Sequence, residues 1–258
     1  MIGGGPAGMQ AAIVLAERGF RPILFERRAY LGGSAVLASK APCKGLVAEY
    51  IETQKNQLAA LGVQVELNHA PTMAELRRLD PYGIFVTMGG QQIVPDIPGI
   101  DRENVFGIED ILLGRRVIEG RKVAVIGGGH VGLEVAHFLC ANNKVTIVEM
   151  ADEIGASVYY ITKFKLLPLL REAGVTFRTG QAIAAVDDGS IRLRDTHTGQ
   201  CTELKAEAVV LAMGSRPDLA ARAAFDRNFD HVVYAGDAVR GGTMLEANRD
   251  AFALAWEF

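Results

Sequence analysis

The chain has 258 residues, of which 49% are hydrophobic and 7% aromatic, and its formal net charge at pH 7 is −3. This length suits one large domain or two smaller ones. Because Lys and Arg (27) do not outnumber Asp and Glu (30), the composition argues against a nucleic-acid partner. No apolar run approaches the roughly 18 residues that span a bilayer, and no signal-peptide pattern is seen. We therefore expect a cytoplasmic protein without a membrane or nucleic-acid partner.

The first motif along the chain is a glycine-rich turn, followed by a helix and a strand. Gly3, Gly5 and Gly8 fit the pattern G-x-G-x-x-G. Apolar residues at helical spacing follow them, and Gly19 suits the end of the predicted helix. The segment RPILFER then indicates a buried strand that ends at Glu26. Turn, helix, strand and acid in this order are typical of a dinucleotide-binding unit.

The same order of features recurs later in the chain. A strand is predicted at Val123–Ile126, followed by a second glycine turn and a helix, and the next strand, Val145–Val148, ends at Glu149. The glycines of this turn are Gly127, Gly129 and Gly132. Two copies in the same context are a much stronger signal than one. The first copy lacks the counterparts of residues 121–124, and we expect an upstream segment of the native chain to supply them.

Other segments predict further strands and a final helix. Strands are expected within residues 62–67, 83–90, 174–180, 190–215 and 231–238, with a hairpin turn at 198–200. Residues 94–101 contain two prolines and predict an irregular connection. Thr243 and Glu246 have the spacing of a capping box, which marks the start of the last helix.

The glycines and acids of the two copies suit the binding of dinucleotides. Without a Cβ, glycine allows a pyrophosphate to approach the turn, and the helix N-terminus offers free N–H groups to the phosphates. The acid after the second strand accepts hydrogen bonds from the ribose hydroxyls, although a solvated acid at a strand end is the alternative for Glu149. Two such sites in one chain suggest electron transfer between a flavin and a nicotinamide.

The segment YAGDA distinguishes the two sites, because it resembles the C-terminal motif of flavoproteins with two dinucleotide-binding domains. That resemblance implies that Asp237 binds the ribityl chain of FAD. It also implies that Thr243, Met244 and Leu245, at the start of the last helix, direct their N–H groups to the flavin. An ordinary strand-to-helix turn is the alternative interpretation of this motif.

Nearly the whole chain resembles the C-terminal half of the 2,4-dienoyl-CoA reductase and NADH:flavin oxidoreductase family. The matching segments include GGGPAGMQAAIVLAERG, VPDIPG, GRKVAVIGGGHVGLEVAHFL and YAGDAVRGGTMLEANRDAF. In that family a separate barrel carries FMN and a cysteine-rich segment binds an iron–sulfur cluster. The resemblance therefore implies a redox partner domain or subunit with those two groups. Trimethylamine and histamine dehydrogenases are related, and they hold ADP in the first site, so a structural ADP-binding module remains the alternative.

The resemblance implies an α/β fold with two Rossmann-like dinucleotide-binding domains. The FAD-binding domain would comprise residues 1–113 and 214–258, with the NAD(P)-binding domain, residues 114–213, inserted in it. The implied reaction is hydride transfer from NADH to FAD, which needs no catalytic side chain. The expected cofactor-binding residues are Gly3, Gly5, Pro6, Ala7, Gly8, Glu26, Arg27, Gly33, Gly89, Gly127, Gly129, His130, Val131, Gly132, Glu134, Glu149, Gly214, Gly236, Asp237, Thr243, Met244 and Leu245. Glu134 matches a nicotinamide contact of related reductases, and a solvated or helix-capping acid is its alternative.

NADH is expected to be preferred over NADPH. The carboxylate of Glu149 would accept bonds from both ribose hydroxyls, whereas it would repel a 2′-phosphate. Asp152 and Glu153 follow it and add negative charge, with no arginine among them. No metal site and no disulfide chemistry are expected, because Cys43, Cys140 and Cys201 are far apart and no histidine cluster is present.

Overall fold

The computed structural model describes residues 1–258, and it consists of two compact units. Unit 1 comprises residues 1–39, 44–91 and 215–258, and unit 2 comprises residues 40–43 and 92–214. The chain leaves unit 1 through β4 (Gln91–Gln92) and returns through β13 (Ser215–Arg216), and these two short strands pair with each other. The first boundary thus differs from the expected one at 113/114, because β5 (Val105–Gly107) pairs with β12 (Ala208–Leu211) inside unit 2.

Unit 1 contains a parallel sheet whose middle position is taken by the start of the chain. The named strands are β1 (Ile23–Glu26), β2 (Gln64–Leu67), β3 (Ile84–Val86) and β14 (Val232–Tyr234), with β1 paired to β2 and β3 to β14. Ile2 bridges to both Phe25 and Val86, so residues 1–2 lie between β1 and β3. The N–H of Ile2 donates to the carbonyl of Phe85 at 2.8 Å, and its own carbonyl accepts from Thr87 at 2.8 Å. Residues 1–2 therefore lead into the first glycine turn from between β1 and β3.

In unit 1, α1 (Pro6–Glu17) packs with α2 (Gly33–Lys40), α3 (Gly45–Ala60) and α9 (Met244–Glu257). The helices α4 (Met73–Leu79) and α8 (Leu219–Asp226) pack in a separate core with residues of β1 and β3. A short 3₁₀ turn, η1, lies at Gly236–Ala238. α1 meets α9 through small side chains, with Ala7 and Ala11 in one core with Ala251 and Ala255. Because these side chains are small, the two backbones lie close together, which brings the start of α9 near the first glycine turn.

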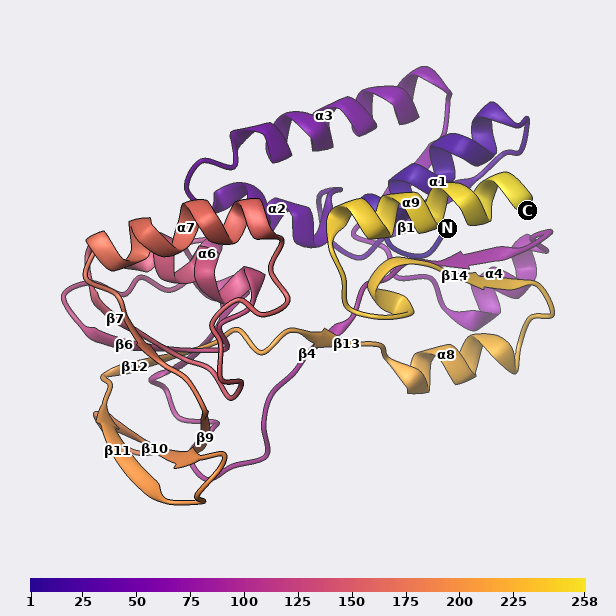
Figure 1. Ribbon diagram of the computed structural model, residues 1–258. Helices are drawn as coiled ribbons and strands as arrows, with labels where there is room; N and C mark the ends of the chain where they lie inside the picture. The colour runs from indigo at the N-terminus through magenta and orange to yellow at the C-terminus, as the bar shows by residue number, and fades with distance from the viewer. The chain divides into compact units, whose positions relative to one another are not determined.

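Unit 2 is built on a five-stranded parallel sheet in the order β5-β12-β6-β7-β8. Its other strands are β6 (Lys122–Ile126), β7 (Lys144–Val148) and β8 (Thr176–Arg178), and its helices are α5 (Ile108–Leu112), α6 (His130–Leu139) and α7 (Tyr160–Glu172). Within this unit, α6 and α7 lie on one face of the sheet, and an antiparallel meander lies on the other (Figure 1). The meander consists of β9 (Gln181–Val186), β10 (Ser190–Asp195) and β11 (Cys201–Lys205). Both faces of the sheet are covered, as parallel sheets require.

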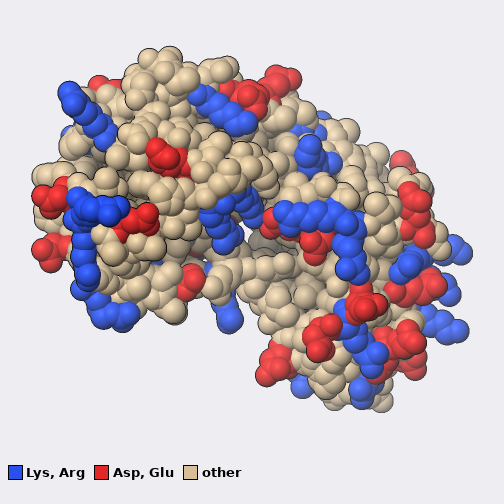
Figure 2. Space-filling view, turned by 180° about the vertical axis from the view of Figure 1, so that it is seen from behind, with Lys and Arg blue, Asp and Glu red and all other residues tan.

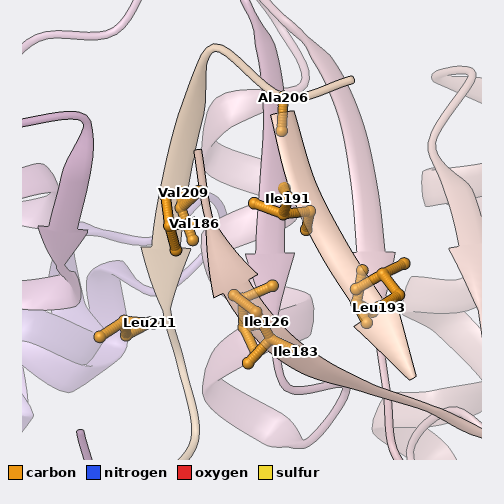
Figure 3. Packing of buried hydrophobic residues seen from close by; sticks show 10 residues of the cluster. Ile126, Ile183, Val186, Ile191, Leu193, Ala206, Val209 and Leu211 are labelled. Atoms are coloured by element: carbon orange, nitrogen blue, oxygen red, sulfur yellow. The ribbon is translucent and has the colours of Figure 1, made fainter. Parts of the chain in front are cut away.

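The core of unit 2 lies between the sheet and the meander. Ile183 and Ile191 of the meander pack against Ile126 and Val209 of the sheet (Figure 3). Ile191 and Val209 have no exposed surface. This packing supports the strand end from which the second glycine turn begins.

Much of the local structure agrees with the sequence. The hairpin turn at 198–200 joins β10 to β11, and Thr243 and Glu246 form the expected capping box. The helices α2, α3, α4, α5, α7 and α8 were not expected from the sequence. In α6, Val135 and Leu139 are buried, whereas Val131 and Phe138 are 37% and 39% exposed.

The surface carries charges of both signs. Acidic and basic side chains are interspersed over the face drawn in Figure 2, in keeping with a net charge of only −3. None of the helices has the length and apolar character needed to cross a membrane.

Candidate dinucleotide-binding sites

The first glycine turn is packed so tightly that two of its glycines admit no side chain. A Cβ on Gly3, where φ is +105°, would lie 2.5 Å from the carbonyl oxygen of Thr87. A Cβ on Gly8 would lie 1.9 Å from the carbonyl oxygen of Gly3. The Thr87 hydroxyl donates to that same carbonyl at 2.8 Å. Sequence reasoning did not identify Thr87, because it follows the distant strand β3.

The second glycine turn repeats this geometry in unit 2. A Cβ on Gly127, where φ is +110°, would lie 2.4 Å from the carbonyl oxygen of Ala212, and one on Gly132 would lie 1.9 Å from that of Gly127. Ala212 follows β12, as Thr87 follows β3. Each turn is therefore held against the end of the neighbouring strand in its own sheet.

The middle glycine of each turn faces open space instead. A Cβ on Gly129 would meet no atom within 4 Å, and one on Gly5 would meet only the Cα of Gly33, at 3.9 Å. Both residues are the N-caps of their helices, and neither provides a side-chain acceptor for the first helical N–H groups. Open space in front of free N–H groups fits a pyrophosphate, so the residues present suit the dinucleotides that the motif implies.

The two predicted acids are tied to their own glycine turns. Glu26 is 6% exposed, and its two carboxylate oxygens accept the N–H groups of Gly4 and Arg28, each at 2.8 Å. Glu149 likewise accepts the N–H of Gly128 at 2.6 Å and that of Ala151 at 2.9 Å. Both carboxylates are thus fixed at the carboxyl ends of β1 and β7, beside the turns.

Further predicted residues gather around the first turn. A Cβ on Gly33, where φ is +51°, would lie 2.9 Å from the Cα of Gly5, so α2 begins directly against the turn. A Cβ on Gly236 would lie 3.1 Å from that of Ala7, which places η1 beside the start of α1. Pro6 occupies the first helical position of α1. Gly5, Pro6, Ala7, Gly33 and Gly236 therefore form one cluster.

Asp237 lies in η1 and is partly buried. Burial raises its pKa, and hydrogen bonds from the Ser215 hydroxyl and the Gly242 N–H act in the opposite direction. Ser215 Oγ lies 3.3 Å from Asp237 Oδ2. Sequence reasoning missed Ser215, which belongs to β13 and is separated from Asp237 by 22 positions.

The start of α9 offers two free N–H groups rather than three. The Thr243 N–H donates to Glu246 Oε2 at 2.8 Å, within the capping box. The expectation that Thr243 directs its N–H to a flavin is therefore wrong, because that N–H already has an acceptor. Met244 and Leu245 are the first two helical residues, and their N–H groups precede the first acceptor of the helix.

Three predicted residues lie apart from these clusters. The side chain of Arg27 is exposed. Gly89 follows β3 with φ +80°, and its Cβ would meet no atom. Gly214 lies at the return crossing, where its carbonyl accepts the Ile93 N–H at 3.0 Å.

In unit 2, a histidine and a carboxylate lie close together at the start of α6. His130 Nε2 lies 3.0 Å from Glu134 Oε1, and the Glu134 residue is 7% exposed. Val131 is the neighbouring residue on the exposed side. A buried carboxylate that faces a histidine is held in one orientation, as a nicotinamide-contacting group would need to be.

The acids that follow Glu149 have basic partners, which the sequence did not reveal. Asp152 Oδ1 lies 2.6 Å from His197 Nε2, and this hydrogen bond raises the pKa of His197. Glu153 pairs with Lys163. Arg178 ends β8 in register with Val148, and its carbonyl accepts the Glu149 N–H at 2.8 Å. The negative charge expected around Glu149 is thus partly offset by these exposed pairs, and Arg178 lies on the adjacent strand.

Comparison with known proteins identifies relatives along the whole chain. The family model described as pyridine nucleotide-disulphide oxidoreductase matches residues 1–231. The NADH oxidase of Thermoanaerobacter brockii is 32% identical over 263 aligned residues, which cover 100% of this chain and 40% of that protein. The cinnamate reductase of Clostridium sporogenes is 30% identical over 99% of this chain and 38% of its own length.

Solved structures agree with these matches. A 2-naphthoyl-CoA reductase complex superposes with a TM-score of 0.90 at 28% identity, covering 100% of this chain and 39% of that one. The thioredoxin reductase of Lactococcus lactis, at 20% identity and a TM-score of 0.78, shows the fold alone. The α/β fold with two Rossmann-like units and the resemblance to the C-terminal half of reductases of this kind are confirmed. The chain spans about two fifths of the relatives' length.

Proposed function

Since the chain belongs to the pyridine nucleotide-disulphide oxidoreductase family, we propose that it binds FAD in unit 1 and NADH in unit 2, and that hydride passes from NADH to FAD. At a coarser level, it is an FAD- and NAD(P)H-binding oxidoreductase module of larger flavoenzymes. The observation that carries the proposal is the repeated turn. Gly8 and Gly132 each lie where a Cβ would be 1.9 Å from a backbone oxygen, while Gly5 and Gly129 face open space.

The division of cofactors between the units rests on Asp237. Only unit 1 combines a glycine turn with a partly buried aspartate and a capped helix, α9, whose first N–H groups are free. These groups suit the ribityl hydroxyls and the pyrimidine ring of a flavin. Unit 2 has Glu134 at the first turn of α6 instead, which suits a nicotinamide.

The residues of this chain bind and orient the cofactors. When they are bound, the nicotinamide supplies a hydride and the flavin accepts it. The glycine turns and helix N-termini hold the pyrophosphates. Glu26 and Glu149 present carboxylates to the riboses, and Asp237 accepts from the ribityl chain. No side chain needs to donate or remove a proton, so positioning supplies the catalysis.

A preference for NADH rests on Glu149 alone. A carboxylate about 4 Å from a 2′-phosphate repels it by on the order of 1–4 kcal/mol. Asp152 and Glu153 add less to this repulsion, because each has a basic partner. We therefore expect about 1.4 kcal/mol, near the lower end of that range, which corresponds to about tenfold.

Electrons then pass from the flavin to a redox partner that carries FMN and an iron–sulfur cluster. One observation supports a partner of some kind, because the relatives are more than twice as long as the segment that they share with this chain.

The test is to load the purified chain with FAD and to mix it anaerobically with NADH. The expected result is loss of the visible absorbance of oxidised flavin, and NADPH should act about tenfold more weakly. A chain that holds ADP and takes up no FAD would instead be a structural module.

A further inference from the structure

Ser215 lies at a crowded position in unit 1. It is the first residue of β13, the strand through which the chain returns from unit 2. A Cβ on Gly90 would lie 3.1 Å from the Ser215 Cβ and 3.2 Å from its Oγ, and a Cβ on Gly241 would lie 3.2 Å from its carbonyl oxygen. The lack of a side chain at Gly90, just before β4, and at Gly241, in the loop before α9, thus leaves room for Ser215.

This packing brings the Ser215 hydroxyl to a carboxylate. Ser215 Oγ is 3.3 Å from Asp237 Oδ2, and the Gly242 N–H is the second donor to the same carboxylate. A carboxylate accepts about four hydrogen bonds, so two donors leave acceptor capacity for a ligand. The two donors also limit how the Asp237 side chain can rotate.

We propose that Ser215 is a positioning residue for the flavin, whose hydroxyl holds Asp237 in the orientation that accepts from the ribityl hydroxyls. The inference rests on the proposed binding of FAD in unit 1. The Ser215 hydroxyl is a neutral donor, so it orients the Asp237 carboxylate without neutralising its charge.

The charged neighbours of Asp237 are engaged with each other. Arg240, Glu246 and Asp250 line the same small hollow as Asp237. Arg240 pairs with Asp250 at 3.6 Å, and Glu246 accepts the N–H and hydroxyl of Thr243. Arg216 is the next residue on β13, and its side chain is exposed. None of these groups replaces the Ser215 hydroxyl.

The experiment compares FAD with ADP as ligands of the full chain, freed of bound nucleotide, by titration calorimetry. ADP has no ribityl group, so it reaches the glycine turn and Glu26 but gives Asp237 nothing to accept. Ser215→Ala should weaken FAD binding by about tenfold, the loss of one hydrogen bond to a charged group, and leave ADP binding unchanged. Ser215→Thr, which keeps the hydroxyl, should recover most of the loss. Ser157→Ala, at an exposed serine of unit 2, is the control.

A second readout is the pH dependence of FAD affinity. Protonation of Asp237 removes a negative acceptor, so the affinity should fall on acidification. Without the Ser215 hydroxyl the Asp237 pKa is higher, and this fall should begin at a higher pH in Ser215→Ala than in the unchanged chain.

The outcomes separate this inference from the proposed function. If the unchanged chain binds FAD much better than ADP, but Ser215→Ala has the same FAD affinity and pH dependence, the inference alone is overturned. If the unchanged chain binds ADP as tightly as FAD, or binds neither, Asp237 has no role in holding a flavin, and the assignment of FAD is overturned as well.

Discussion

Glu149 Oε2 accepts the N–H of Gly128 at 2.6 Å, which ties the acid after β7 to the glycine turn after β6. Glu26 makes the same bond to Gly4 at 2.8 Å in unit 1. In both units the carboxylate that would face the ribose also braces the turn that would face the pyrophosphate. Substitutions of these acids can therefore separate the effect of their negative charge on nucleotide binding from the effect of the hydrogen bond that holds the turn.

For Glu149, the informative comparison is between Glu149→Gln and Glu149→Ala. The amide oxygen of Gln can still accept from Gly128, so we expect the fold and NADH binding to change little while the preference over NADPH falls to near unity. Ala removes the acceptor and should weaken both nucleotides. Calorimetric titration with NAD⁺ and NADP⁺ measures both effects. An unchanged ratio in Glu149→Gln would show that the charge sets no preference.

For Glu26, burial makes the loss of the acceptor costly. Glu26→Ala leaves the N–H groups of Gly4 and Arg28 without their acceptor, and we expect a loss of about 1–3 kcal/mol in the free energy of unfolding. Glu26→Gln retains one oxygen and should lose less. Chemical denaturation of the chain without cofactor gives the values. Equal stability of the two variants would mean that the oxygen retained by Gln does not stabilise the fold as an acceptor.

Alanine should have different effects at the two kinds of glycine in the second turn. It should lower stability at Gly132 and weaken nucleotide binding at Gly129. In Gly132→Ala the new Cβ would overlap the Gly127 oxygen, and we expect a loss of about 3 kcal/mol in unfolding free energy. Gly129→Ala has space for the Cβ, so it should fold normally but bind NADH poorly, because the methyl group occupies the pyrophosphate side. Gly45→Ala, at an open position that starts α3, is the control. Thermal melts and nucleotide titrations separate the two effects, and tight NADH binding by Gly129→Ala would contradict the proposed phosphate position.

Asp237 should lower the stability of the chain, although it contributes to FAD binding. Burial raises its pKa above the value in the unfolded chain. The ionised carboxylate therefore destabilises the folded state above that raised pKa, and the penalty disappears as the pH falls through it. Asp237→Asn should melt higher than the unchanged chain at neutral pH, with a difference that shrinks on acidification, and should bind FAD less well. A lower melting temperature at neutral pH would be the opposite of this expectation.

The parts of the fold that follow from local sequence were predictable. The first turn with α1 and β1, and the second with β6, α6 and β7, are each contiguous segments in which glycine spacing, apolar periodicity and a terminal acid occur together. The capping box at Thr243 has the same local character, because both of its partners lie within four residues. The expected NADH preference also began from a local feature, the acid at the end of β7.

Tertiary structure decided the features that depend on residues far apart in the sequence. Thr87 lies against Gly3 because β3 and the segment at Met1–Ile2 end at the same edge of one sheet. Ser215 reaches Asp237 from the separate pair of β4 and β13, and His197 reaches Asp152 from the turn between β10 and β11. The two-residue segment at Met1–Ile2 serves as the middle of a sheet because β1 and β3 supply its partners on both sides. Local sequence specifies which atoms can form a turn. The packing of strands determines that the carbonyl oxygens of Thr87 and Ala212 lie 2.5 Å and 2.4 Å from where a Cβ on Gly3 and on Gly127 would stand, and tertiary contacts determine which acid has a basic partner.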